Sequence, residues 1–163
     1  MSILNGEGAH CEFTGVTFAG KGQYLDTGSK VIHNAPNTTS NINSNPFPRW
    51  RRLHLSRQRG HWGKAEGAKS NVSCESLMLD EQSQSDTIPA IVIKNDNVDL
   101  GHEAKIGRIS DEAIFYLMSR GLSEDEARAM LVRGFVEPVS KALPLEYAVE
   151  MNNLINLELK GSM

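Results

Sequence analysis

The sequence predicts an α+β protein with a β-rich part at residues 1–109 and a helical part at residues 110–163. In the first part, short apolar runs are separated by glycines or by Asn/Asp clusters, a pattern typical of many short strands joined by turns. In the second part, apolar residues recur at helical spacing behind capping residues. Three consecutive helices after a β-rich region indicate layers that are segregated along the chain. No strict repeat period is visible, so the residues leave a β-solenoid, a meander and a sandwich open.

Length and composition indicate one domain, or a piece of a larger one. The 163 residues carry a formal net charge of −3, which argues against a general binder of polyanions. No apolar run approaches the roughly 18 residues of a membrane helix, and the start MSILNGEGAHCEF does not resemble a signal peptide. With only Cys11 and Cys74, a disulfide framework is not expected. These features predict a cytoplasmic protein that does not enter a membrane.

Strands are predicted where apolar residues alternate with polar ones or form a short apolar run. Alternating patterns cover residues 11–18 and 72–79, and in the second of these Val72 and Cys74 lie on one side. The run Ile91-Val92-Ile93 predicts a buried strand, and a further strand is expected at 98–100 after an Asn-Asp-Asn turn.

Residues 45–62 interrupt the β pattern. The window NPFPRWRRLHLSRQRGHW holds five of the nine arginines and both tryptophans, and it has no acidic residue. Basic residues interleaved with aromatic ones suit single-stranded nucleic acid, whereas a solvated loop is the plainer interpretation and fits the acidic remainder of the chain. We therefore expect an insert-like segment without strands, and nucleic acid is not the favoured partner.

Capping residues set the bounds of the predicted helices. Ser110 precedes the acidic first turn of one helix, and Gly121 follows its end. Ser123 and Glu126 form a capping box for the next helix, and Pro144 suits the first turn of a last one. The apolar face predicted for the second helix consists of Ala127, Met130, Leu131 and Phe135. The face predicted for the last helix consists of Leu145, Ala148, Val149, Asn152, Ile155 and Leu159.

Three residues could carry chemistry, although their spacing alone is a weak signal. Cys74 in the middle of a predicted strand is most simply a small buried apolar residue. His102 and Glu103 are adjacent at a predicted strand end, so only one of them can face the side that Cys74 faces. A thiolate with an imidazole or a carboxylate could bind iron or zinc, or a Cys-His pair could act as a nucleophile. No P-loop and no GxGxxG motif is present, so ATP hydrolysis and dinucleotide binding are not expected.

Several separate motifs resemble one protein family. These are GEGAH, FAGKGQYLDTGSKVIHNAPNTTSNI, GAKSNVSCESLMLDEQSQSDTIP, GHEAKIGRIS, FYLMSRGLSEDEARAMLVRGFVEP and LPLEYAVEMNNLINLELKGS. In this order they resemble the C-terminal portion of the SufB/SufD scaffolds of the Suf iron–sulfur cluster assembly system, and the SufB branch more than the SufD branch. The resemblance covers nearly the whole chain except about 45–62.

The resemblance implies a right-handed parallel β-helix followed by a helical C-terminal domain. It implies a scaffold and not an enzyme, which pairs through its β-helix with SufD or a second copy and takes sulfur from a donor protein. It also implies that helices at 111–120 and 124–137 dock the SufC ATPase, so that ATP acts only through that partner. The docking residues that follow from the motif are Phe115, Tyr116, Leu117, Arg120, Gly121, Met130, Arg133 and Phe135.

For the site, the resemblance implies a transient iron–sulfur cluster. Cys74 matches the family cysteine that receives sulfur and holds the cluster, Glu103 matches a carboxylate ligand, and His102 is a neighbouring candidate ligand. Gly101 stands where the family usually has an acidic residue, which removes a third ligand. A thiolate paired with oxygen ligands suits a cluster that is held and then released.

Two departures leave alternatives open. In the window 45–62, the arginine-, proline- and tryptophan-rich run replaces a lysine- and glycine-rich family stretch at preserved length. This favours the hypothesis of a local reading-frame shift that is later restored. The chain also begins inside the family's β-helix, so a remnant that docks the ATPase without cluster chemistry is the rival interpretation, with nucleic-acid binding by 49–62 as a weaker one.

Overall fold

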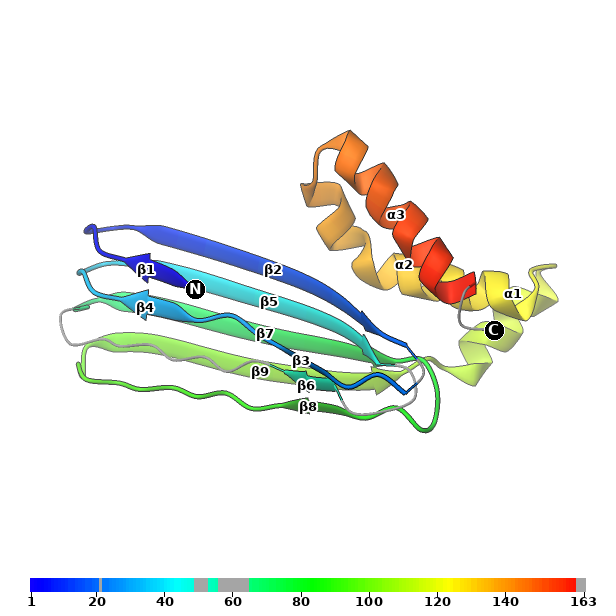
Figure 1. Cartoon of the computed structure of the whole chain (residues 1–163), viewed down its shortest axis with the longest axis horizontal. Helices are drawn as coiled ribbons and strands as arrows, with labels where there is room; N and C mark the ends of the chain where they lie inside the picture. The colour runs from blue at the N-terminus through cyan, green and yellow to red at the C-terminus, as the bar shows by residue number, and fades with distance from the viewer. Residues whose placement is uncertain (21, 49–52, 56–64, 161–163) are drawn as a thin grey trace.

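The computed structural model describes residues 1–20, 22–48, 53–55 and 65–160 (Figure 1). Strands fill the first part of the chain and three helices the second, as the sequence predicts. The strands stack into long, nearly parallel rows, and the helices lie against one end of these rows. The last strand ends at Arg108 and the first helix begins at Asp111.

Every strand pairing in the described residues is parallel. The strands are β1 (Ser2–Leu4), β2 (His10–Ala19), β3 (Leu25–Thr27), β4 (Val31–His33), β5 (Thr39–Pro48), β6 (Leu53–Leu55), β7 (Ala68–Met78), β8 (Ser85–Thr87) and β9 (Val98–Arg108). They form three sheets with the orders β1-β4, β2-β5-β7-β9 and β3-β6-β8. Neighbouring strands in each sheet are separated in sequence by strands of the other sheets, which is the connectivity of a coil.

The strand register identifies this coil as a β-solenoid. His10 pairs with Thr39, Thr39 with Lys69, and Lys69 with Asp99, so the chain returns to the same position after 29, 30 and 30 residues. About three turns are formed in this way. The β-solenoid implied by the family resemblance is therefore confirmed, and the meander and the sandwich are excluded.

One corner of each turn uses a left-handed backbone conformation. Gly8 has φ 69°, Asn37 has φ 56° and Gly67 has φ 68°, and these residues are again 29 and 30 positions apart. Only glycine adopts this conformation freely, and asparagine is the residue that tolerates it next best. A Cβ at Gly67 would also lie 2.7 Å from Asn37 Oδ1, so a larger residue here would have to displace the Asn37 side chain.

Alternating side chains give the four-stranded sheet an inner and an outer face. Ile42, Val72 and Cys74 are buried together with Leu4 and Val31 from the two-stranded sheet, so the inner face points into the solenoid. The side predicted for Val72 and Cys74 is confirmed. Because the rungs stack in register, each inner residue contacts its counterparts one rung before and after.

Capping residues predict where the first two helices begin and where the first one ends, whereas the second helix runs past the expected residue 137 to Ala142. The three helices are α1 (Asp111–Ser119), α2 (Glu124–Ala142) and α3 (Leu145–Lys160). The Ser110 side chain accepts from Ala113 N, and Ser123 and Glu126 form the reciprocal capping box. Gly121 follows the first helix with φ 97°, the left-handed C-terminal conformation. No helix in the described ranges is long and apolar enough to cross a bilayer.

The helices pack on the outer face of the four-stranded sheet at its C-terminal end (Figure 1). Phe18 and Phe47 stack with ring centroids 4.6 Å apart, and Phe135 from α2 meets Phe47 edge to face at 5.3 Å. The buried core shared by strands and helices consists of Phe47, Ile109, Ile114, Ala127, Val132, Val136 and Ile155. Solenoid and helices are therefore joined by one apolar cluster.

Two strand predictions are wrong. Residues 45–48 continue β5, and β6 lies at 53–55, so the window 45–62 contains strands where none was expected; its other residues lie outside the described ones. The parallel register extends β5 because Phe18 and Phe47 are paired rung neighbours. Conversely, Ile91-Val92-Ile93 forms no strand and is 41%, 41% and 52% exposed. This segment belongs to the last rung, which no further rung covers within the described chain.

The predicted helix faces are partly wrong. In α2 the buried residues include Val132 and Val136, whereas Met130 is 44% exposed. In α3 Ile155 is buried as predicted, but Leu145 is 76% exposed and Val149 52%. The helix α2 contacts the sheet on one side and α3 on the other, so its buried surface is set by two neighbours and not by one apolar stripe.

Candidate functional site

Cys74 lies inside the solenoid. It is the seventh residue of β7, it is 3% exposed, and its rung neighbours are Ser44 on β5 and Ala104 on β9. Thr87 on β8 donates a hydrogen bond from Oγ1 to Cys74 Sγ at 3.5 Å. Both cysteines of the chain are free thiols. The prediction, made from the residues alone, that Cys74 is a small buried strand residue is thus correct for its position. A reaction at this thiol requires access to the interior of the solenoid.

His102 lies on the same inner face as Cys74. It is the rung neighbour of Val72, two residues along from the Cys74–Ala104 pair. Its Nε2 atom is buried and has no hydrogen-bond partner among the described residues. The prediction that His102 lies at a strand end is wrong, because β9 continues to Arg108 and His102 lies in its middle. Burial of a ring nitrogen without a hydrogen-bond partner costs free energy, so a ligand that bonds to this nitrogen would offset that cost.

Glu103 lies on the opposite, outer face. Ser73 donates to Glu103 Oε1 at 3.2 Å, and Lys105 Nζ is 3.7 Å from the same oxygen. Lys105 also pairs with Glu75 at 3.1 Å. The hydrogen bond to Glu75, then the charges of Glu103 and Glu75, raise the pKa of the Lys105 ammonium. These groups are exposed, so the ion pairs contribute little to stability.

The sequence rule that only one residue of the His-Glu pair can face Cys74 is confirmed, and that residue is His102. The thiol and the imidazole share the interior, whereas the carboxylate is separated from them by the sheet. Among the residues that the structure describes, no three His, Cys, Asp or Glu side chains are placed to hold a metal ion together. The described chain therefore separates the predicted residues into an inner pair, Cys74 and His102, and an outer carboxylate, Glu103.

Comparison with known proteins decides the family. The family model described as SUF system FeS cluster assembly, SufBD core domain, matches residues 1–135. The chain belongs to the SufBD family. It is 52% identical over 162 residues to the iron–sulfur cluster assembly protein SufB of Bacillus subtilis, and equally so to a SufBD family protein of Staphylococcus saprophyticus. A SufBD family protein of Staphylococcus aureus is 51% identical over the same length. These matches cover 99% of this chain and 35% of each relative, so the chain spans about a third of the curated relatives' length.

The SufBD core match contains all three predicted site residues and the first helix. Gly101, which replaces the acidic residue usual in the SufBD motif, lies on the outer face beside Asn71. A Cβ at Gly101 would be 2.8 Å from Asn71 Oδ1. A larger side chain at this position would therefore have to displace the asparagine amide.

Sequence reasoning missed a buried hydrogen-bond chain in this SufBD solenoid. Thr38 donates to the Ala35 carbonyl at 3.0 Å, so its oxygen accepts from His33 Nδ1 at 2.8 Å. The other ring nitrogen, Nε2, then accepts from Ser40 at 2.9 Å, and Ser40 and Ser70 are bonded at 2.8 Å. Burial lowers the pKa of His33, which favours this neutral form. The sequence gives no sign of this chain of bonds, because rung neighbours are not visible before the register is known.

The residues that the SufBD resemblance assigns to ATPase docking fall into two groups. Exposed on α1, on α2 and in the turn between them are Phe115, Tyr116, Arg120, Gly121 and Met130. Leu117 and Phe135 instead pack against the core shared with the sheet, and Arg133 donates to Asn156 on α3 at 3.1 Å. Only the first group is available to a partner without rearrangement. The nucleic-acid alternative at 49–62 rests mainly on residues outside the described ones.

Proposed function

We propose that this chain is the C-terminal part of a SufB-like scaffold on which iron–sulfur clusters are assembled, and that it has no catalysis of its own. The observation that carries the proposal is the 52% identity over 162 residues to the SufB protein of Bacillus subtilis. The two free cysteines and the absence of a membrane-crossing helix in the described ranges suit assembly in the reducing cytoplasm.

In this proposal the inner pair, Cys74 and His102, and the outer carboxylate of Glu103 have different roles. Inside the solenoid, the Cys74 thiolate takes the outer sulfur of a donor persulfide, whose S–S bond breaks and whose thiolate leaves, or it binds iron. His102, whose Nε2 lacks a partner in the described residues, is its nitrogen neighbour. Glu103 offers a hard oxygen ligand on the outer face. Because the sheet separates Cys74 from Glu103, a cluster that uses both needs a movement of β9.

Iron and sulfide content after anaerobic reconstitution tests the proposal. We expect Cys74→Ala to lose bound iron and sulfide, whereas Cys11→Ala, the matched control at the other thiol, retains both. His102→Asn is expected to lower iron content and Glu103→Gln to lower its retention. Equal iron and sulfide content in Cys74→Ala and the unmodified chain would refute the role of Cys74.

We propose two partners. The exposed group on α1 and α2 docks a SufC-type ATPase, and the free edge of β9 receives the solenoid of SufD or a second copy. In support, β9 pairs only with β7 in the described residues, and Ile106 on its inner face is 47% exposed. An unpaired edge with exposed apolar residues is a surface for strand addition. Loss of ATPase co-purification in Phe115→Ala, compared with Lys141→Ala at the far end of α2, tests the first partner.

The second candidate is a docking module without cluster chemistry. It is favoured by the burial of Cys74 and by the lack of a three-ligand group in the described residues. This candidate predicts ATPase binding at full strength with no iron or sulfide in the complex. Measuring metal content in the co-purified complex distinguishes it from the scaffold.

A further inference from the structure

Two buried polar atoms flank Cys74 on the inner face and lack hydrogen-bond partners among the described residues. Ser76 follows Cys74 by two positions on β7, so it lies on the same face, and it is 4% exposed. Its Oγ atom is one of the two, and Nε2 of His102, the rung neighbour of Val72, is the other. A buried hydroxyl without a partner costs free energy, so a ligand that accepts a hydrogen bond from Ser76 would offset that cost.

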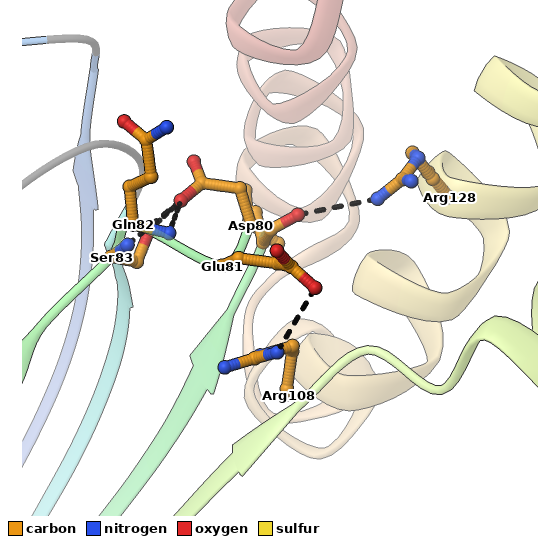
Figure 2. Close-up of polar contacts among 7 residues, drawn as sticks. Asp80, Glu81, Gln82, Ser83, Arg108 and Arg128 are labelled. Carbon is orange, nitrogen blue, oxygen red and sulfur yellow. Dashed lines mark hydrogen bonds and ion pairs between the residues drawn. The ribbon is translucent and has the colours of Figure 1, made fainter.

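Beyond Ser76, β7 leads into the turn at residues 79–84, which is bonded to the end of β5 (Figure 2). Ser83 in this turn is 6% exposed, and its Oγ lies 2.8 Å from both the Pro48 carbonyl and Asp80 Oδ1. Asp80 Oδ1 also accepts from Ser83 N at 2.8 Å. The buried hydroxyl of the turn is therefore already bonded, whereas that of Ser76 is left to bind a group attached to Cys74.

The spacing of the Ser76 and Cys74 side chains matches one added sulfur atom. Two residues that are two positions apart on a strand are separated by about 6.6 Å. A sulfur–sulfur bond lengthens the cysteine side chain by about 2 Å. The outer sulfur of a persulfide on Cys74 therefore comes within hydrogen-bonding distance of the Ser76 hydroxyl, although Cys74 Sγ itself forms no hydrogen bond with it.

The inner sulfur already has a donor. Thr87 on β8 donates from Oγ1 to Cys74 Sγ at 3.5 Å, which leaves the outer sulfur as the acceptor for Ser76. An ionised acceptor strengthens a hydrogen bond, and the outer sulfur of an ionised persulfide carries the negative charge. A hydroxyl always has a proton to donate, whereas Nε2 of His102 donates in only one of its two neutral tautomers. These points favour Ser76 as the donor to the outer sulfur.

We infer that Ser76 is a sulfur-binding residue, whose hydroxyl donates to the outer sulfur of a persulfide on Cys74. The inference rests on the proposed role of Cys74 as a sulfur acceptor. In the transfer, the Cys74 thiolate attacks the outer sulfur of a donor persulfide and forms a new S–S bond. The donor's own S–S bond breaks, its thiolate leaves, and the proton of the new perthiol passes to solvent. Thr87 then bonds the inner sulfur and Ser76 the outer one.

The test is the equilibrium of sulfur exchange between the full chain and glutathione persulfide with glutathione, on a Cys11→Ala background and without iron. Loading and removal of sulfur are both followed to a constant value, so the result does not depend on how fast the reagent reaches the buried thiol. Intact mass spectrometry measures the fraction of chains that carry one added sulfur. We expect Ser76→Ala to lower the equilibrium constant about tenfold, because a hydrogen bond to a charged group is lost. Ser76→Thr, which keeps the hydroxyl, should remain close to the value of the unmodified chain.

Ser70→Ala is the matched control. Ser70 lies on the same strand and the same face, but its hydroxyl is bonded to Ser40 at 2.8 Å and it is four residues from Cys74. Its replacement should lower the free energy of unfolding in urea and leave the sulfur equilibrium unchanged. Ser76→Ala should show the reverse pattern, with a sulfur-free unfolding free energy that is unchanged or higher, because a buried hydroxyl without a partner is removed.

Three outcomes would count against the inference. Equal equilibrium constants for Ser76→Ala and the unmodified chain would overturn it and leave the role of Cys74 intact. A loss of stability in Ser76→Ala as large as that in Ser70→Ala would also overturn it, because the hydroxyl would then have a partner in the sulfur-free chain. If the unmodified chain gains no sulfur at any ratio of the reagents, both the inference and the proposed acceptance of sulfur by Cys74 fail.

Discussion

Phe47 of the solenoid and Phe135 of α2 meet edge to face with ring centroids 5.3 Å apart, and Phe47 is completely buried. Phe47 also stacks on Phe18 in the neighbouring rung. An edge-to-face aromatic pair adds to the free energy of burial. This pair is therefore a main point at which strand packing and helix packing depend on one another.

Replacing Phe47 by Ala should lower the free energy of unfolding by about 3–5 kcal/mol, the usual effect of removing a buried phenyl ring. Urea unfolding followed by circular dichroism measures it. Phe115→Ala is the control, because Phe115 is 73% exposed and its loss should change stability by less than about 0.5 kcal/mol. Equal effects of the two variants would show that the shared core is not formed.

A side chain at the Gly67 corner should be destabilising. We expect Gly67→Ala to lose more than about 1 kcal/mol of unfolding free energy, because φ is 68° and the new Cβ would meet Asn37 Oδ1 at 2.7 Å. Gly107→Ala in β9, where nothing lies within 4 Å of the new Cβ, is the matched control. A stability loss in Gly107→Ala as large as that in Gly67→Ala would contradict the assigned corner geometry.

Stability should fall with acidification because of His33. Burial lowers its pKa in the folded state, so the unfolded chain binds the proton more readily than the folded one. The contribution is therefore complete above the unfolded pKa of about 6.5 and is lost as pH falls below it towards the folded pKa. Urea unfolding across this range measures the effect. His33→Gln should remove this component of the pH dependence, whereas His10→Gln should retain it; an unchanged profile in His33→Gln would assign the effect to other groups.

The capping box at the start of α2 should contribute measurably. Ser123 accepts from Glu126 N at 3.4 Å, and Glu126 accepts from Ser123 N at 2.8 Å. The Ser123 hydroxyl, which donates to the Glu126 carboxylate at 2.7 Å, and then the Ser123 N–H lower the pKa of Glu126. Ser123→Ala should cost about 1 kcal/mol of unfolding free energy. Ser119→Ala, which removes only an exposed bond to the Tyr116 carbonyl, should cost less, and the reverse order would argue against the cap.

The helical part could be predicted in detail because its signals are local. A capping serine, a glycine after the last turn and an i to i+3 capping box act within one turn of helix, so Ser110, Gly121 and Ser123 define boundaries without knowledge of the fold. The apolar faces were predicted less well. Met130 and Val149 lie on exposed surfaces because α2 and α3 are buried by neighbours that are distant in sequence.

The solenoid was harder to predict because the repeat is visible in the residues of the turns and not in those of the strands. Glu7-Gly8-Ala9 and Glu66-Gly67-Ala68 are the same corner two rungs apart, and Asn37 occupies the corner between them. An asparagine in place of the glycine hides the period. Ile91-Val92-Ile93 has the composition of a buried strand, but burial also needs a covering rung, which composition cannot supply.

The sequence by itself determined the order of strands and helices, the helix caps, the inward face of Val72 and Cys74, and membership of the SufBD family through its motifs. Tertiary structure alone decided that the coil repeats after 29 or 30 residues, that His102 and Glu103 lie on opposite faces of the sheet, and that Arg128 reaches the turn beside β8. The reason is physical. Caps and side-chain alternation depend on neighbours within a few residues, whereas rung register joins groups about 30 positions apart and helix docking joins groups still more distant, which a single sequence does not show.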